Sequence, residues 1–307
     1  MKEVTPDYYS QFECIAGKCK HNCCIGWEID IDEKALNFYR NLESPLGKRI
    51  MNNIEGDEPH FILDENERCP FLNCDNLCEI ISECGKEALC DICRLHPRFR
   101  NFYTGFVETG LGLCCEEAAR IILSLRNKFC IHIPDGVEPN GCEKVFFEIR
   151  SKIFNILQNR DLKISKRFDC LSQMFGLKFD FSIKRLCEVY LSLERLDEEW
   201  TRELENLANY EFNSAIFDDD RFSLPLEQLS VYFIFRHLAG ALEYGDYSER
   251  VMLAAAGCYV IAALWEYHKD ELTDEKMIDI VRMYSSEIEY SEENIDFLLF
   301  SLKNTII

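Results

Sequence analysis

Cysteine is the residue type with which this sequence could do chemistry. Twelve of its seventeen cysteines lie between positions 14 and 115, in the segments CIAGKCKHNCC, CPFLNCDNLC, CGKEALCDIC and LCC. Thiolates are soft ligands that select zinc or iron–sulfur clusters. In a reducing compartment, clustered cysteines bind metal more often than they form structural disulfides. The pattern therefore predicts a metal or cluster site, with redox-active disulfides and reduced structural thiols as the alternatives.

The cysteine spacing matches no common template. A zinc ribbon needs two CxxC pairs, and this chain has one, Cys90 and Cys93. The bacterial ferredoxin run CxxCxxCxxxC is absent. Cys19 and Cys23 form a CxxxC, but Gly26 stands where the CxxxCxxC signature of radical S-adenosylmethionine enzymes has its third cysteine. An iron–sulfur cluster, zinc, and one or two sites all stay open.

The elements that position the thiols are predicted to be short. Cys90 and Cys93 would share one face of a helix of one or two turns. Residues 99–113 are rich in aromatic residues, Val and Gly, which indicates a β-hairpin. Within them, VETGLGLCC resembles the glycine loop of Rossmann-type methyltransferases, but a third glycine is missing. We therefore favour a glycine-bearing hairpin over a cofactor loop.

From Glu143 onward the apolar residues recur at helical spacing. The expected helices are 143–158, 163–175, 182–208, 225–243, 247–268, 273–286 and 291–303. The fold class is thus mainly α, a helical bundle with an N-terminal cysteine-rich, loop-rich, metal- or cluster-binding part and a short β-hairpin. We expect a boundary near residue 140, between a cysteine-rich part (1–140) and an all-helical part (141–307), although the two could pack as one domain.

The formal net charge of -21 argues against nucleic acid or an anionic membrane as a partner, because both carry the same sign. Residues 251–265 form the longest apolar run, which is too short for a bilayer span and suits a buried helix. The N-terminal residues lack an apolar run behind a basic patch, so no signal peptide is expected. These features predict a cytoplasmic protein.

Several runs resemble the bacterial flagellin lysine-N-methylase family. They are CIAGKCKHNCCIGWEIDID, CPFL, GKEALCDICRLHPR and LCCEEAARIIL, with LSVYFIFRHLAGAL in the helical part. The thiol half also resembles a broader group of zinc- or iron-chelating cysteine-cluster proteins. The family resemblance implies transfer of methyl from S-adenosylmethionine to lysines of flagellin, and an iron–sulfur cluster of the 4Fe–4S type.

The resemblance also implies the ligands, with zinc as the alternative to the cluster. The candidates are Cys19, Cys23, Cys24, Cys69, Cys78, Cys90, Cys93 and Cys115. These are more thiols than one cluster needs, so either some do not ligate or there are two sites.

Candidate catalytic residues lie in the segment YFIFRH. On a helix, Tyr232 and Arg236 share a face, whereas His237 is turned away from Tyr232. Attack by lysine needs the neutral amine, and a Tyr, a His or a carboxylate could accept its proton. Tyr232 and Arg236 are the predicted catalytic residues; the alternative is an arginine that pairs with an acid for stability. The sequence shows no recognisable pocket for the methyl donor. The alternative function is a non-enzymatic zinc- or iron-binding or trafficking protein whose helical half docks a partner.

Overall fold

The computed structural model describes residues 1–303, which form two compact units. The cysteine-rich unit comprises Glu13–Arg98 and Cys115–Glu117. The helical unit comprises Met1–Phe12, Phe99–Cys114 and the chain from Ala118 onward. This division differs from the expected boundary near residue 140, because the β-hairpin packs with the helices that follow it rather than with the thiol segments.

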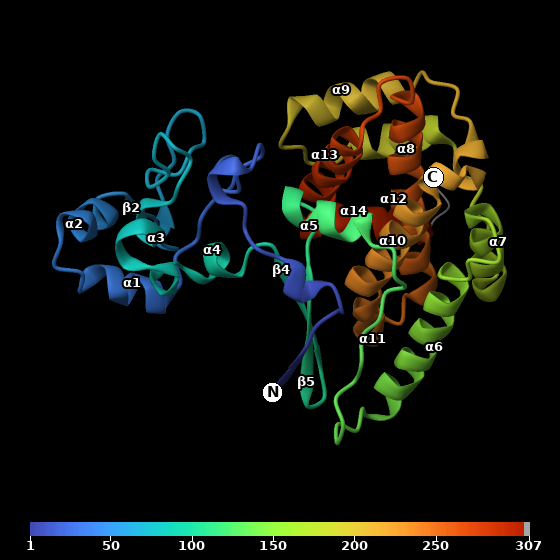
Figure 1. Ribbon diagram of the computed structural model, residues 1–307, viewed down its shortest axis with the longest axis horizontal. Helices are drawn as coiled ribbons and strands as arrows, with labels where there is room; N and C mark the ends of the chain where they lie inside the picture. Colours follow the sequence, from blue (N-terminus) through green and yellow to red (C-terminus); the bar gives the residue numbers. More distant parts are fainter. Residues whose placement is uncertain (304–307) are drawn as a thin grey trace. The chain divides into compact units, whose positions relative to one another are not determined.

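The cysteine-rich unit is built from short elements joined by loops (Figure 1). They are α1 (Glu33–Arg40), α2 (Pro45–Met51), β2 (Ile54–Glu55), β3 (His60–Phe61), α3 (Glu79–Cys84) and α4 (Asp91–Leu95). Local signals fix their starts: the Asp32 side chain accepts from the Ala35 amide at the start of α1, and Ser44 caps α2, which begins at Pro45.

The core of this unit is small and rich in aromatic rings. The rings of Tyr39 and Phe61 lie 6.2 Å apart, and those of Phe61 and Phe71 lie 5.0 Å apart. Cys69 and Cys90 are buried among these residues. The thiols therefore form part of the apolar core as well as the predicted site.

The helical unit confirms the mainly α prediction, with most helices close to their expected bounds (Figure 1). They are α5 (Glu116–Ser124, whose first two residues belong to the cysteine-rich unit), α6 (Gly141–Leu157), α7 (Ile164–Phe175), α8 (Ile183–Leu191), α9 (Glu198–Leu207), α10 (Asp220–His237), α11 (Ala241–Tyr244), α12 (Tyr247–Tyr267), α13 (Asp274–Tyr284) and α14 (Glu292–Lys303). A π-helix, η6 (Ser285–Glu289), follows α13 directly.

Two expected helices differ in the structure. The segment 182–208 divides into α8 and α9, because Asp197 accepts from the Glu199 amide and starts a new helix. The expected helix 225–243 begins five residues earlier, at Asp220, because Asp219 caps it. Pro225 therefore lies inside α10 rather than at its start.

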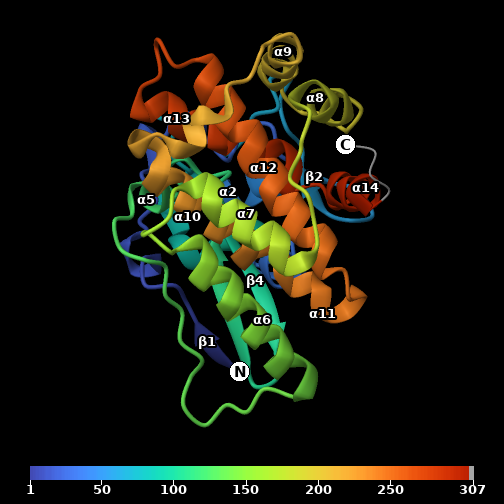
Figure 2. The ribbon, with the colours of Figure 1, turned by 90° about the vertical axis from the view of Figure 1, so that its right-hand side faces the viewer.

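Helix α12 is the centre of the helical unit and packs against α8, α9, α10, α13 and α14 (Figure 2). Its residues are apolar on all sides, which is typical of a helix buried on every face. Among the described residues it is the one helix long and apolar enough to cross a membrane, yet 78% of its most apolar window is buried inside the fold. This burial agrees with the expected core helix.

The predicted hairpin is confirmed. Strands β4 (Arg98–Tyr103) and β5 (Phe106–Leu111) are neighbours, and β1 (Lys2–Val4) pairs with β5 in parallel. A Cβ atom at Gly110 would lie 2.3 Å from the Phe99 ring and 2.7 Å from the Phe235 ring. Gly110 is thus needed for close packing of β5 against its neighbours, not for a cofactor loop.

The helical unit also holds ion pairs that are removed from solvent. Arg150 on α6 binds both carboxylate oxygens of Glu108 on β5, at 2.7 and 2.6 Å. Glu227 on α10 pairs with Arg167 at 2.6 Å and with Arg160 at 2.7 Å, and its own side chain is fully buried. These pairs satisfy charges that would otherwise be costly to bury.

Candidate functional site

Six of the predicted metal ligands interact with one another in the cysteine-rich unit. This six-thiol group consists of Cys23, Cys24, Cys69, Cys78, Cys90 and Cys93. All but Cys23, which is exposed, belong to the core of the unit or pack against it. The group combines three of the four cysteine segments singled out in the sequence.

Backbone contacts bring these segments together. The Cys69 amide donates to the Cys24 carbonyl at 2.9 Å, which joins the first segment to the second. Leu72 and Cys78 form an isolated antiparallel bridge that folds the second segment back on itself. Cys90 is the N-cap of α4, so Cys93 follows one turn later.

The thiols of Cys23 and Cys24 interact, as do those of Cys90 and Cys93, and the interaction lowers the pKa of Cys23 and of Cys90. The contact of Cys90 with Cys93 confirms that they share a face of a short helix. Burial raises the pKa of Cys69 to about 11, and the neighbouring thiols Cys78 and Cys90 raise it too. Like charges therefore disfavour several thiolates together, and a bound cation would remove that penalty.

The donor chemistry of this group fits a thiolate-bound metal or cluster. Six sulfur ligands at a largely buried position are the kind of donor set that zinc and iron–sulfur clusters use. Within residues 1–303, however, no three His, Cys, Asp or Glu side chains are close enough, as they stand, to hold an ion. Binding would therefore require the thiols to turn toward a common centre.

The two remaining predicted ligands form a separate pair. The structure places Cys19 beside Cys115 and Glu116, with 3.5 Å between the Cys19 Sγ and a Glu116 oxygen. The Lys20 amide donates to the same oxygen at 2.9 Å. Burial raises the pKa of Cys19 to about 12, and the charges of Glu116 and Cys115 add to it. The surplus of candidate ligands is thus divided between two places in the cysteine-rich unit.

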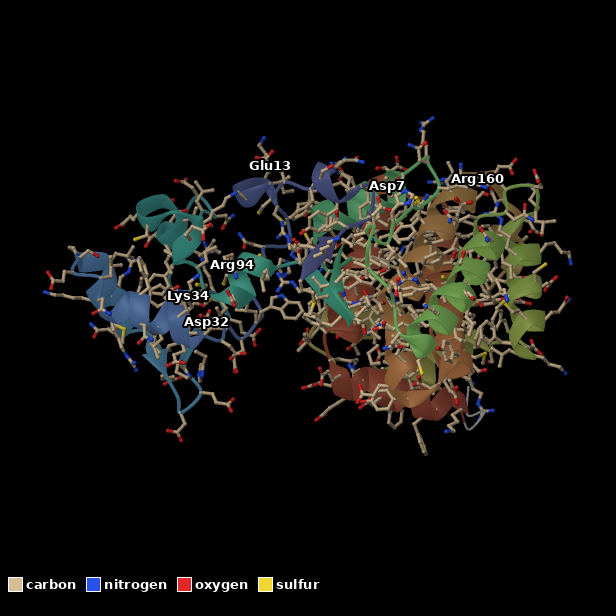
Figure 3. The ribbon with its side chains drawn as sticks, turned by 90° about the horizontal axis from the view of Figure 1, so that it is seen from below. Asp7, Glu13, Asp32, Lys34, Arg94 and Arg160 are labelled. Atoms are coloured by element: carbon tan, nitrogen blue, oxygen red, sulfur yellow. The ribbon has the colours of Figure 1, made fainter. Side chains whose placement is uncertain are left out.

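Charged residues near α4 have structural partners. Asp32 accepts from the Asp91 amide at 2.7 Å, and the Arg94 guanidinium pairs with the Asp91 carboxylate at 2.5 Å. Figure 3 labels Asp32 and Arg94, which come from the start of α1 and from α4. The Asp32 carboxylate therefore ties α1 to the segment that carries Cys90 and Cys93.

A second polar centre lies in the helical unit around Glu289, at the end of η6. Its Oε1 lies 2.7 Å from His237 Nε2 and 3.2 Å from Arg236 Nε. Its Oε2 accepts from the Tyr232 hydroxyl at 2.9 Å and from the Ser285 hydroxyl. We call these five residues the Glu289 centre.

The Glu289 centre brings the predicted catalytic residues together. Tyr232 and Arg236 share a face of α10, as expected, and Arg236 Nη1 lies 3.4 Å from the Tyr232 hydroxyl oxygen. His237, expected to be turned away from Tyr232, nevertheless meets the same carboxylate, because Glu289 on η6 reaches both. The Arg236 guanidinium lies over the Phe99 and Tyr290 rings, 4.9 and 4.8 Å from their centroids. The pairing of Arg236 with an acid matches the structural alternative, and a catalytic role for Tyr232 or Arg236 stays a prediction.

Burial and charge set the protonation of this centre. Although burial opposes it, the pKa of Glu289 is lowered by Arg236 and by the hydrogen bond to His237. Burial lowers the pKa of His237 and raises that of Tyr232 well above its ordinary value. The carboxylate is therefore charged at neutral pH, while the imidazole and the phenol are neutral.

Sequence reasoning missed Glu289 and Ser285. They lie in SSEIEYSEE, a run of polar and acidic residues with no motif. The one available signal was the apolar residue Ile288 between two glutamates, just after a predicted helix. Such a pattern does not distinguish a buried carboxylate from a solvated one.

Comparison with known proteins places the Glu289 centre in a family context. Residues 222–306 match the family model for the FliB lysine N-methylase C-terminal domain. This part of the chain, which we call the FliB-type domain, is similar to that C-terminal domain. The residues of the Glu289 centre all lie in this FliB-type domain.

Curated relatives support the same family. A lysine-N-methylase of Salmonella typhimurium and one of Salmonella choleraesuis are each 27% identical over 167 residues, which cover 51% of this chain and 42% of the relative. The flagellar biosynthetic protein FliU of Salmonella muenchen is 25% identical over 167 residues, or 98% of its length. The predicted resemblance to the lysine-N-methylase family is confirmed, and the alignment spans less than half of the two methylases. No solved structure matches this chain.

Proposed function

We propose that this chain is a cytoplasmic protein lysine N-methyltransferase that uses S-adenosylmethionine and acts on flagellin. The observation that carries the proposal is the FliB-type domain at 222–306, together with relatives named lysine-N-methylase and a flagellar biosynthetic protein. Within that domain the Glu289 centre contains an imidazole and a carboxylate, groups of the kind that can accept a proton from an amine, which supports the proposal.

We further propose that the six-thiol group holds an iron–sulfur cluster of the 4Fe–4S type, with zinc as the alternative. Two of these thiols, Cys69 and Cys90, lie in the core of the cysteine-rich unit. Three more, Cys24, Cys78 and Cys93, pack against this core. When bound, such a group would cross-link the loops of this unit, which have little secondary structure of their own. The group has more thiols than one cluster needs, so the others could exchange as ligands or bind a second ion.

The test of the enzyme proposal is a transfer assay. Protein purified without oxygen is incubated with radiolabelled S-adenosylmethionine and unmethylated flagellin, and label in lysine is located by mass spectrometry. We expect label in flagellin lysines and none in flagellin whose lysines are acetylated beforehand. A chain that binds metal but transfers no methyl would support the non-enzymatic metal-binding or trafficking protein instead.

The test of the cluster proposal is an analysis of iron, zinc and acid-labile sulfide with an optical spectrum. About four irons and four sulfides per chain would support the cluster, in line with thiolate-bound iron–sulfur chemistry. Zinc without sulfide would show a zinc-stabilised unit. Cys93→Ser is expected to lose most of the metal, whereas Cys74→Ser, at an exposed cysteine outside the six-thiol group, should retain it.

A further inference from the structure

We propose that His237, oriented by Glu289, takes the proton from the substrate lysine, so that the Glu289 centre is the general-base site of the enzyme. This inference rests on the proposed methyl transfer and adds to it two residues with assigned roles. His237 would be the catalytic residue that touches the amine. Glu289 would be a positioning residue that acts through His237.

The position of Glu289 is determined by contacts on both carboxylate oxygens. Oε1 meets His237 and Arg236, and Oε2 accepts from Tyr232 and Ser285. The Arg236 guanidinium also donates to the Glu289 carbonyl at 3.0 Å. A carboxylate with this many partners cannot rotate freely, so it presents one oxygen to His237 in a defined direction.

The imidazole of His237 has one nitrogen bound to Glu289 and, among the described residues, no hydrogen bond at the other. Nε2 lies 2.7 Å from Glu289 Oε1, which requires Nε2 to carry the hydrogen when the ring is neutral. Nδ1 then has the lone pair. Among the described residues no hydrogen bond to Nδ1 is found, and the His237 side chain is 10% exposed. The ring also stacks on Phe233, with an interplanar angle of 28°.

The neighbouring charges favour a neutral imidazole that can accept a proton. Burial lowers the pKa of His237 most, and Arg236 on α10 and Arg250 on α12 lower it further, whereas Glu289 on η6 raises it. Arg250 also donates to the His237 carbonyl at 2.9 Å. The lone pair of Nδ1 is therefore available near neutral pH, and the imidazolium that forms is stabilised by the Glu289 carboxylate.

The lysine ammonium breaks one N–H bond, and its proton moves to Nδ1 of His237. The freed lone pair of the amine forms a bond to the methyl carbon of a sulfonium donor, whose C–S bond breaks with the electron pair going to sulfur. The proton then leaves His237 to water, which restores the neutral ring.

Tyr232 and Arg236 support this site without taking the proton. Burial raises the pKa of Tyr232 well above its ordinary value, so its hydroxyl stays protonated and donates to Glu289. Arg236 is a permanent cation that cannot act as a base. The carboxylate belongs to a π-helix, an element that occurs often at functional sites.

The experiment measures methyl transfer by three variants of the full chain at several pH values. For His237→Gln we expect kcat to fall by about 10²-fold, the range for loss of a general base, with KM for flagellin nearly unchanged. For Glu289→Gln we expect a fall of about tenfold. The acidic limb of its pH profile should also move to lower pH, because the charge that raises the pKa of His237 is gone.

Glu287→Gln is the matched control. Glu287 belongs to the same π-helix and is also buried, but its carboxylate accepts from the Leu196 and Asp197 amides and not from the Glu289 centre. Its kcat and acidic limb should stay close to those of the wild type. Loss of activity by E287Q and E289Q alike, with no shift of the limb, would show that only the fold of η6 matters and would overturn the inference.

A rescue experiment keeps the test independent of folding. His237→Ala leaves space for a free imidazole, so added imidazole should restore part of its kcat and should not change that of H237Q. The inference would be overturned if the wild type transfers methyl and H237Q and E289Q keep its kcat. It would also be overturned if imidazole does not rescue H237A. In both cases the methylase proposal would stand. Absence of transfer by the wild type would overturn the proposed function itself.

Discussion

The two units of this protein are stabilised in different ways. The helical unit has long helices around α12, which is apolar on all faces. In this unit the buried charges of Glu108 and Glu227 are each paired with an arginine. The cysteine-rich unit has helices of eight residues or fewer, and thiols take part in its core. A core this small gains little from apolar burial, so a bound metal or cluster would supply much of its stability.

The difference also separates two kinds of chemistry. In the cysteine-rich unit, burial and neighbouring thiols raise the pKa of Cys69 and Cys78, so the thiolate forms of these two residues are unfavourable without a cation. In the Glu289 centre, a carboxylate is already paired with Arg236 and hydrogen-bonded to His237. In the proposed function, the cysteine-rich unit receives a ligand, whereas the helical unit already holds a set of paired polar groups.

Removal of metal should give the largest effect. With a chelator under anaerobic conditions, we expect residues 13–98 to become sensitive to protease while the helical unit stays resistant, since structural metal sites contribute on the order of 10 kcal/mol to folding. Limited proteolysis with mass spectrometry locates the cuts, and added metal should restore protection. Equal resistance of both units after complete metal removal would contradict the comparison.

Glu227→Ala should be the most damaging single change in the helical unit. It leaves Arg167, which is buried, without its carboxylate, and loss of one partner of a buried pair costs about 3–5 kcal/mol. Urea denaturation followed by circular dichroism measures the free energy of unfolding. Lys166→Ala removes an exposed pair with Asp169 on α7 and should leave this free energy unchanged within error. A loss of the same size in both variants would be unexpected.

Gly110→Ala should destabilise the contact of the hairpin with α10. The added methyl would overlap the Phe99 and Phe235 rings, and overpacking of this kind costs about 1–3 kcal/mol. The matched control is Gly141→Ala at the start of α6, where a Cβ atom meets nothing within 4 Å. Thermal denaturation should show a lower midpoint for the first variant alone. An unchanged midpoint would mean that Phe99 or Phe235 moves aside without cost.

Asp32→Ala should give the smallest loss, about 1 kcal/mol, because it removes the cap of α1 and the acceptor for the Asp91 amide. Although burial opposes it, hydrogen bonds from backbone amides, first that of Ala35, lower the pKa of Asp32. Its contribution is therefore complete above the pKa of an unfolded aspartate and is lost as the pH falls through the lower folded value.

Asp32→Asn separates the two effects. It keeps an oxygen that can cap α1 but does not titrate in this range, so the stability of the cysteine-rich unit should lose part of its dependence on acidic pH. Unfolding of the metal-loaded chain is followed between neutral and acidic pH in all three forms. If the wild type and D32N share the same pH dependence, Asp32 is not a source of it.

Local spacing was enough for much of the fold. Helical periodicity predicted α6, α7, α12 and α14 nearly to the residue, because each has an apolar side that recurs every three or four positions. Side-chain caps decided the exceptions: Asp197 splits the segment 182–208, and Asp219 starts α10 early. A cap depends on one side chain and one amide, so periodicity alone does not reveal it.

The lysine-N-methylase resemblance could be recognised from residue types and short motifs alone, because motif spacing is a local property. The metal site predicted from the softness of the thiol ligands stays a prediction. Contacts across the chain were needed to separate six thiols from the pair Cys19 and Cys115, and to join His237 to Glu289, which lie 52 positions apart. A buried carboxylate and a solvated one look the same in a sequence. Packing of η6 against α10 is what distinguishes them.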